Sequence, residues 1–187
     1  MRRSRTKPIG VETFTPLLAA SPTRLELVDG QVVAFAGGSA AHSILALRIA
    51  GLLAATVRPP CVAHGADFAV RIDTRATYVF PDAHVTCEPF DPDATASIAP
   101  KLVVEVISPE SNYRDRVEKL DAYRSIASVE EYLLVDSRKV WVCTYRRFAT
   151  AWHDAVFGAD DSFELYSVGL HIAVSDLYAG TGRVIAP

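Results

Sequence analysis

The sequence predicts an α/β fold with a mixed central sheet flanked by helices and with additional β-hairpins. The main observation is KLVVEVI at 101–107, a nearly continuous β-branched run that is typical of a strand buried on both faces. Apolar residues at helical spacing occur before this run, at 40–57, and after it, at 112–126. This order of hairpin, helix, strands, helix and strands favours one central sheet with helices packed against it.

The first predicted elements are a hairpin and a helix. In RLELVDGQVVAF (24–35), Asp29-Gly30 separates two apolar-rich runs and favours a type I′ turn. Ser39 is a suitable cap for the helix at 40–57, which the following prolines end. The other predicted elements are a loop at 89–100, strands at 67–72, 77–86, 131–137, 139–145 and 149–157, and a strand with a short helical turn within 170–180.

The length and charge of the chain predict one domain with a short basic arm. A single domain takes about 100–200 residues, so we assign 21–187 to one domain and 1–20 to a basic N-terminal arm, because MRRSRTK carries four positive charges and no acid. The arm is either disordered or a local contact for a polyanion. The whole chain has a net charge of −3, so bulk charge alone cannot hold nucleic acid.

Hydropathy and cysteine usage indicate a cytoplasmic protein with no membrane segment. No apolar run reaches the roughly 18 residues that cross a bilayer, and no apolar stretch follows the basic start. The three cysteines are far apart and form no CxxC pair, so we expect neither a zinc site nor a disulfide framework.

Two carboxylates stand out as candidate metal ligands. Glu105 lies in the middle of the buried strand, where a lone carboxylate costs several kcal/mol unless it is paired or binds a cation. Asp82 follows Pro81 inside an apolar strand, and proline there favours an edge or a bulge of the kind found beside active sites. If the two converge, they form an oxygen site suited to Mg²⁺ or Mn²⁺. The alternatives are a structural ion pair between Glu105 and an arginine, and an ordinary Pro-Asp turn.

Lys119 is the candidate catalytic cation. The chain has only four lysines, and this one shares a helix face with Asp115 and Tyr123 at i−4 and i+4. The alternative is a solvated helix face on which Asp115 and Lys119 form a weak surface pair.

Taken together, these segments resemble the PD-(D/E)XK restriction-endonuclease-like superfamily, and more closely its Uma-type branch of bacterial endonuclease-like proteins. The matching text is RLELVDGQVV, AAHSILALRI, FPDAHV, KLVVEVISPES, YRDRVEKLDAYRSIASVEEYLLVDS and VWVCTYRR, in that order. The resemblance implies a restriction-endonuclease-like fold and a metal-dependent endonuclease.

The resemblance also assigns roles to residues. It implies that Asp82, Glu105 and the main-chain carbonyl of Val106 bind the metal. The signature lysine would stand at position 107, which is Ile107 here. In the Uma-type pattern the following helix supplies the lysine, and Lys119 matches that position.

Four residues are supporting candidates. Glu26 matches a family acid that could extend the metal shell, or it faces solvent from the hairpin. His42 stands where the family often has histidine, or it is a capping or core histidine. Asp115 is a candidate to orient Lys119, and Tyr123 contacts phosphate or simply packs.

The function predicted is phosphodiester hydrolysis in nucleic acid, most simply DNA, with Asp82 and Glu105 binding the metal and Lys119 assisting water activation. Cleavage of both strands would need two sites, so a homodimer is expected.

One rival is a catalytically inactive nuclease-fold binding or structural module, which Ile107 and the negative charge favour. A second rival is a hydrolase of another phosphate ester. In the predicted nuclease, local arginines would contact the nucleic acid. These are Arg2, Arg3, Arg5, Arg71, Arg75, Arg114, Arg116, Arg146 and Arg147.

Overall fold

The computed structural model describes residues 7–34, 37–108 and 114–183, and of 114–116 only the main chain. A six-stranded mixed sheet forms the centre, in the order β11-β10-β9-β8-β6-β3. Its only parallel pair within the described chain is β8–β9, which the helical segment after β8 connects. Its strands are β3 (Val62–Gly65), β6 (Ala83–Thr86), β8 (Pro100–Ile107), β9 (Glu131–Asp136), β10 (Val142–Phe148) and β11 (Ala151–Phe157).

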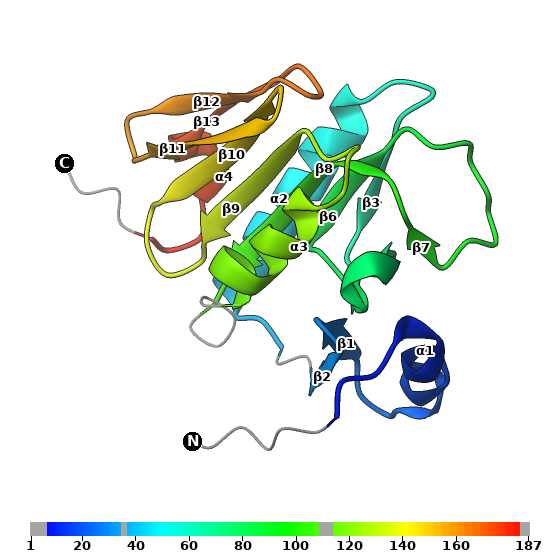
Figure 1. Cartoon of the computed structure of the whole chain (residues 1–187). Coiled ribbons are helices and arrows are strands. Elements are labelled where there is room, and N and C mark those ends of the chain that lie inside the picture. The colour runs from blue at the N-terminus through cyan, green and yellow to red at the C-terminus, as the bar shows by residue number, and fades with distance from the viewer. Residues whose placement is uncertain (1–6, 35–36, 109–113, 184–187) are drawn as a thin grey trace.

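Helices cover both faces of this sheet (Figure 1). Helix α2 (Ala40–Thr56) and helix α4 (Val174–Tyr178) pack on the face that carries Val104 and Val106. The π-helical segment η2 (Arg114–Lys119) leads into helix α3 (Leu120–Arg124), which packs on the opposite face with Val103 and Ile107. Strand β8 is therefore covered on both sides, as its run of aliphatic residues predicts.

A five-stranded sheet, in the order β2-β1-β5-β4-β7, lies beside the central sheet. The predicted hairpin is confirmed, since Asp29 and Gly30 both have positive φ between β1 and β2. A short 3₁₀ helix, η1 (Asp73–Arg75), separates β4 from β5, and β12 pairs with β13 near the C-terminus. The strands are β1 (Leu25–Val28), β2 (Gln31–Ala34), β4 (Ala69–Ile72), β5 (Thr77–Val79), β7 (Ala96–Ser97), β12 (Ser162–Leu165) and β13 (Leu170–Ala173).

Residues 11–20 were expected to belong to a basic arm, but they form helix α1 (Val11–Ala20). The helix packs on the five-stranded sheet because Val11, Phe14 and Leu18 recur at helical spacing. Phe14 is fully buried, and its ring lies 5.8 Å from that of Tyr78. The arginines before residue 7 lie outside the described residues.

The expectation that the cysteines form no disulfide is wrong, since Cys61 and Cys87 form one. Strands β3 and β6 pair with Val62 opposite Thr86, so the residues that flank this pair meet across the ladder. A sequence separation of 26 hides this proximity in the chain. The remaining cysteine, Cys143, is buried.

The predicted helix at 40–57, with its Ser39 cap, is confirmed, and so is the strand at 131–137. The predicted strand at 77–86 is divided at Pro81 and Asp82 into β5 and β6, which belong to different sheets. Over the described chain, no helix has the length and apolar character to span a bilayer.

Candidate active site

The site begins where β6 and β8 lie side by side. These strands pair with Ala83 opposite Val104, which brings Asp82 and Glu105 next to one another at the start of β6. Asp82 Oδ2 accepts a hydrogen bond from the Val106 main-chain nitrogen over 2.7 Å. An extended residue directs its N–H and C=O to the same side of its strand, so the Val106 carbonyl also points to the Asp82 side.

Glu105 is buried in β8, with 4% of its surface exposed. Its Oε1 atom accepts hydrogen bonds from Lys119 Nζ over 2.9 Å and from the Tyr123 hydroxyl over 2.9 Å. The Lys119 pairing offsets part of the cost of burying the carboxylate. Among the described residues, the charged partner of Glu105 is a lysine, whereas the structural alternative named an arginine.

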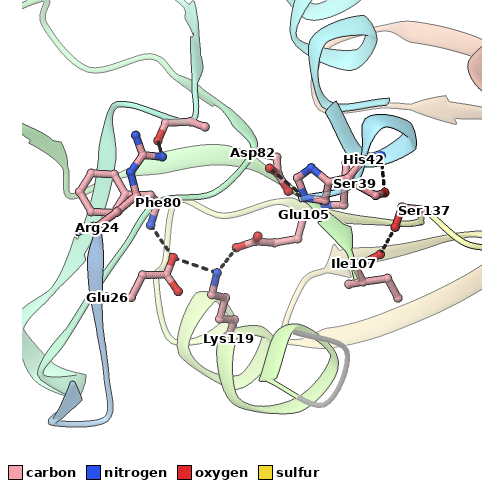
Figure 2. A network of polar contacts seen from close by, with 12 residues as sticks. Arg24, Glu26, Ser39, His42, Phe80, Asp82, Glu105, Ile107, Lys119 and Ser137 are labelled. Atoms are coloured by element: carbon pink, nitrogen blue, oxygen red, sulfur yellow. Dashed lines mark hydrogen bonds and ion pairs between the residues drawn. The ribbon is translucent and has the colours of Figure 1, made fainter. Parts of the chain in front are cut away.

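Lys119 is the last residue of η2, and only 4% of its surface is exposed. Its ammonium lies between two carboxylates, 2.9 Å from Glu105 Oε1 and 3.1 Å from Glu26 Oε1 (Figure 2). The solvated-face alternative is therefore wrong. Ile107, at the position of the signature lysine, is fully buried among apolar side chains, so the helix supplies the cation that the strand lacks.

Glu26 is the residue of the five-stranded sheet that contacts Lys119. It lies in β1, is 2% exposed, and accepts a hydrogen bond from the Phe80 main-chain nitrogen over 3.0 Å at the same Oε1 atom that Lys119 contacts. The solvent-facing alternative for Glu26 is wrong. The two sheets are thus connected through one buried lysine.

His42 lies at the other side of Asp82, with 3.4 Å between its Nε2 atom and Asp82 Oδ1 (Figure 2). Ser39 begins the helix that carries it, and its hydroxyl accepts a hydrogen bond from the His42 main-chain nitrogen over 3.2 Å. A Cβ atom added to Gly38 would lie 2.6 Å from His42 Nδ1. Gly38 therefore leaves the space that the imidazole occupies, a role that the sequence did not reveal.

Asp115 lies in η2, but its side chain is outside the described residues, so its predicted action on Lys119 stays a prediction. Val117 lies three residues before the buried Leu120, within the segment at 112–126 that the sequence predicts as a helix, yet it is 45% exposed. The wider π-helical turn changes which residues face the sheet, and such turns are frequent at functional sites.

A hollow of about 460 Å³ leads from the surface to Asp82 and His42. Gly38, Ala46 and Leu47 also line it, and Leu47 is 75% exposed at its edge. Glu105 and Lys119 are buried and do not line this hollow. Of the candidate metal ligands, Asp82 is the one that lines it.

The charges and oxygen donors of the site suit a divalent cation. Glu26, Asp82, Glu105 and Lys119 together have a formal charge of −2. Two carboxylates and a main-chain carbonyl are the ligand types that Mg²⁺ and Mn²⁺ prefer. Among the side chains that the structure describes, no three His, Cys, Asp or Glu groups gather as a metal site, so a metal here would depend on the Val106 carbonyl and water as well.

His84 is a buried residue of β6, the strand that begins directly after Asp82. It lies two residues after Asp82 in β6, is fully buried, and its ring nitrogens have no hydrogen-bond partner within the described structure. Burial, with a smaller effect from His64, lowers the pKa of His84 to about 3. The residue is therefore neutral near pH 7 and packs as an aromatic ring against His64 and Phe68.

Of the nine arginines expected to contact nucleic acid, the four with described side chains are engaged within the chain. Arg71 binds Glu12 and Asp73, Arg75 binds Asp29, and Arg146 binds Glu131. Arg147 donates to the main-chain carbonyls of Arg124, Ile126 and Val129. The side chains of Arg2, Arg3, Arg5, Arg114 and Arg116 are outside the described residues.

Two proteins are similar to this chain in sequence. A protein of Synechocystis sp. (strain ATCC 27184 / PCC 6803 / Kazusa), “Uncharacterized protein slr1290”, is 35% identical over 158 residues, covering 83% of this chain and 83% of that protein. A second protein of the same organism, “Uncharacterized protein sll1609”, is 30% identical over 115 residues, covering 59% of this chain and 65% of that protein.

The fold has a solved relative. A crystal structure from Anabaena variabilis ATCC 29413, described as “a putative nuclease belonging to DUF820”, superposes with a TM-score of 0.77 at 20% identity, covering 93% of this chain and 99% of that one. This likeness shows a shared restriction-endonuclease-like fold. The Uma2 family, described as “Putative restriction endonuclease”, matches residues 11–175. Because that match spans most of the sequence, the chain belongs to the Uma2 family.

Proposed function

We propose that this protein is a metal-dependent endonuclease that hydrolyses phosphodiester bonds in nucleic acid. The observation that carries the proposal is the position of Lys119, whose buried ammonium lies 2.9 Å from Glu105 although it comes from a helix. Two carboxylates from neighbouring strands and a lysine from the following helical segment form the chemical set that the family resemblance implies. Family membership supports the same activity.

Asp82, Glu105 and the Val106 carbonyl would hold Mg²⁺ or Mn²⁺. When bound, such a cation polarises the phosphate and lowers the pKa of a coordinated water. The formal negative charge of the site favours binding of a cation over an anion. The side chains around these ligands would orient the carboxylates and stabilise the charge that develops on the phosphate.

Lys119 holds Glu105 and Glu26 in place and supplies positive charge beside the position where negative charge develops on the phosphate. Tyr123 fixes the same Glu105 oxygen from the next helical turn. His42 and the Val106 nitrogen orient the two oxygens of Asp82. We expect these contacts to keep both carboxylates aimed at one point, as ligand-supporting hydrogen bonds do in metal sites.

The substrate we propose is DNA. The net charge of −3 means that binding depends on local contacts, and it should weaken steeply with salt if phosphate contacts dominate. A homodimer would supply the two sites that cleavage of both strands needs. Cytoplasmic localisation is part of the same proposal, although the Cys61–Cys87 disulfide removes the cysteine argument for it.

Incubation of supercoiled plasmid and of single-stranded RNA with Mg²⁺ or Mn²⁺ tests the proposal. We expect metal-dependent nicking or linearisation of the plasmid that EDTA stops and that Glu105→Gln abolishes. A matched control is Glu130→Gln, because Glu130 is an exposed acid next to β9 whose described ion pair is a surface contact with Lys101. Cleavage by Glu105→Gln at the wild-type rate would contradict the assignment.

The rival function is a nuclease fold that binds without turnover. The specific observation for it is Ile107, which leaves the strand without its signature lysine. Under that alternative, folded wild type shows no metal-dependent cleavage of either substrate, and Lys119→Met changes stability alone.

A further inference from the structure

A second hollow lies away from the candidate active site, between the end of β6 and the loop that precedes β8. Its volume is about 410 Å³, within the range of small-ligand pockets. Three ring side chains line it: His64 from β3, Phe68 before β4, and Phe90 from the loop. His64 and Phe68 already contact each other, with 4.5 Å between their ring centroids.

The charged side chains that line this hollow are acidic. Glu88 and Asp91 line it, and its lining includes neither lysine nor arginine. His64 adds no compensating charge near pH 7, because burial lowers its pKa more than Glu88 raises it. The hollow therefore carries two negative charges beside aromatic rings, which repels phosphate groups and attracts cations.

The hollow is held in shape by its own contacts. Ser97 Oγ donates a hydrogen bond to Glu88 Oε2 over 2.5 Å, which fixes the carboxylate. The Cys61–Cys87 disulfide joins the strands immediately before Val62 and Glu88, both of which line the hollow. A pocket with its polar group already oriented loses little entropy when a ligand binds.

The rim of the hollow exposes large apolar side chains. Phe90 is 71% exposed, Ile98 is 63% exposed, and Val62 is 37% exposed, and all three line the hollow. Large exposed apolar side chains gathered around one hollow are typical of partner-binding surfaces. A small solute in the hollow would leave much of this rim in contact with water.

We propose that this hollow binds an arginine side chain presented by a partner polypeptide. The guanidinium group is planar, stacks on aromatic faces and binds carboxylates through paired N–H groups, so it matches both the rings and Glu88. The residues that flank the arginine in the partner cover Phe90 and Ile98. The proposal concerns a surface distinct from the Asp82–Glu105 region and does not depend on nuclease activity.

Calorimetric titration of the full chain with short peptides tests the proposal. The probe is acetyl-Leu-Arg-Leu-amide, and the matched control is the same peptide with citrulline, which has the shape of arginine without its charge. We expect the arginine peptide to bind at least about tenfold more tightly than the citrulline peptide, since hydrogen bonds to charged groups exceed neutral ones by about that factor. Equal binding of the two, or no binding at millimolar concentration, would overturn the proposal.

Variants separate the pocket from non-specific attraction. Glu88→Gln keeps an acceptor for Ser97 but removes the charge, and we expect it to weaken the arginine peptide about tenfold. Asp93→Asn is the control, because Asp93 is an exposed acid of the same loop that does not line the hollow. An effect of Asp93→Asn as large as that of Glu88→Gln would contradict a specific site. Agmatine, a small guanidinium compound, should bind more weakly than the peptide, and equal affinity would overturn the assignment to a polypeptide.

Discussion

Lys119 Nζ lies 2.9 Å from Glu105 Oε1, although 14 residues and a change from strand to helix separate the two. In the superfamily pattern that the sequence resembles, the lysine stands two residues after the acid on the same strand. Here that position is Ile107, and the ammonium reaches the acid from the helical segment instead. The cation is thereby positioned by packing of η2 and α3 on the sheet rather than by strand geometry.

Replacement of Lys119 by methionine is expected to destabilise the protein and to abolish cleavage. The variant leaves Glu26 and Glu105 buried without their shared ammonium, which typically costs about 3–5 kcal/mol. Chemical denaturation measures this loss in the free energy of unfolding. A matched control is Lys101→Met, because Lys101 is half-buried and forms a longer surface pair with Glu130. Similar stabilities for the Lys119→Met variant and wild type would show that the ammonium does not pair as described.

Removal of the Tyr123 hydroxyl is expected to affect Glu105 more mildly. Tyr123→Phe keeps the buried ring and deletes one hydrogen bond to the carboxylate, worth about 1.5–3 kcal/mol for a charged acceptor. Because groups that orient metal ligands typically contribute 10–100-fold to activity or metal affinity, we expect cleavage to fall by about that factor. Cleavage rates at saturating metal measure it, and an unchanged rate would assign Tyr123 to packing alone.

The space around His42 can be tested with two neighbouring glycines. Gly38→Ala places a Cβ atom 2.6 Å from His42 Nδ1, so the imidazole must turn away from Asp82. Gly37→Ala is the control, because a Cβ atom there meets nothing within 4 Å. We expect Gly38→Ala alone to reduce cleavage, with melting temperatures of the two variants within a few degrees of each other. Equal cleavage by both variants would remove His42 from the site.

Stability is expected to depend on pH through His84. Its pKa is about 3 in the folded protein, against an ordinary value of 6.5. Below about pH 6.5 the unfolded chain binds a proton that the folded chain does not, so the free energy of unfolding falls as pH is lowered toward 3. The expected slope is on the order of 1 kcal/mol per pH unit.

Denaturation of wild type and His84→Phe between about pH 6.5 and pH 5 measures this dependence. The variant should lose much of the slope and keep the part due to His64, whose pKa is also lowered. His153→Gln is the control, because His153 is exposed. If His84→Phe and wild type lose stability in parallel, His84 is not the neutral buried group described.

The disulfide is expected to stabilise the fold. Removal of a cross-link that closes a loop with a sequence separation of 26 costs about 3 kcal/mol, so the Cys61→Ala/Cys87→Ala double variant should be less stable than oxidised wild type by about that amount. Reductant should destabilise wild type and leave the double variant unchanged. Iodoacetamide should label one cysteine of the unfolded oxidised chain and three after reduction, as mass spectrometry can show. Labelling of all three before reduction would contradict the bond.

Much of the fold could be predicted because local patterns and tertiary packing agree. The Asp29-Gly30 turn, the Ser39 cap and the run at 101–107 each predict the element that forms. Strand β3 and the Cys61–Cys87 bond could not be predicted, because they depend on pairing between segments about two dozen residues apart. Helix α1 was not predicted, because the basic residues before it favour an arm over a packed helix.

Some residues of the candidate site could be predicted from the sequence, and others could not. Glu105 could be found because a carboxylate inside a buried strand is costly, and Asp82 because proline interrupts its strand. Glu26 could not be separated from a solvent-facing hairpin residue, since only the contact between the two sheets buries it. His84 carries no sequence signal, because its burial comes from the rings of His64 and Phe68.

Calorimetric titration with Mn²⁺ tests most directly the proposal that Asp82 and Glu105 hold a catalytic metal beside Lys119. We expect wild type to bind one Mn²⁺ in this region, and Asp82→Asn and Glu105→Gln to lose that binding. Lys119→Met should still bind Mn²⁺, because it removes a competing cation from Glu105, but it should not cleave DNA. Folded wild type that binds no Mn²⁺, or Glu105→Gln that binds it as wild type does, would contradict the proposal.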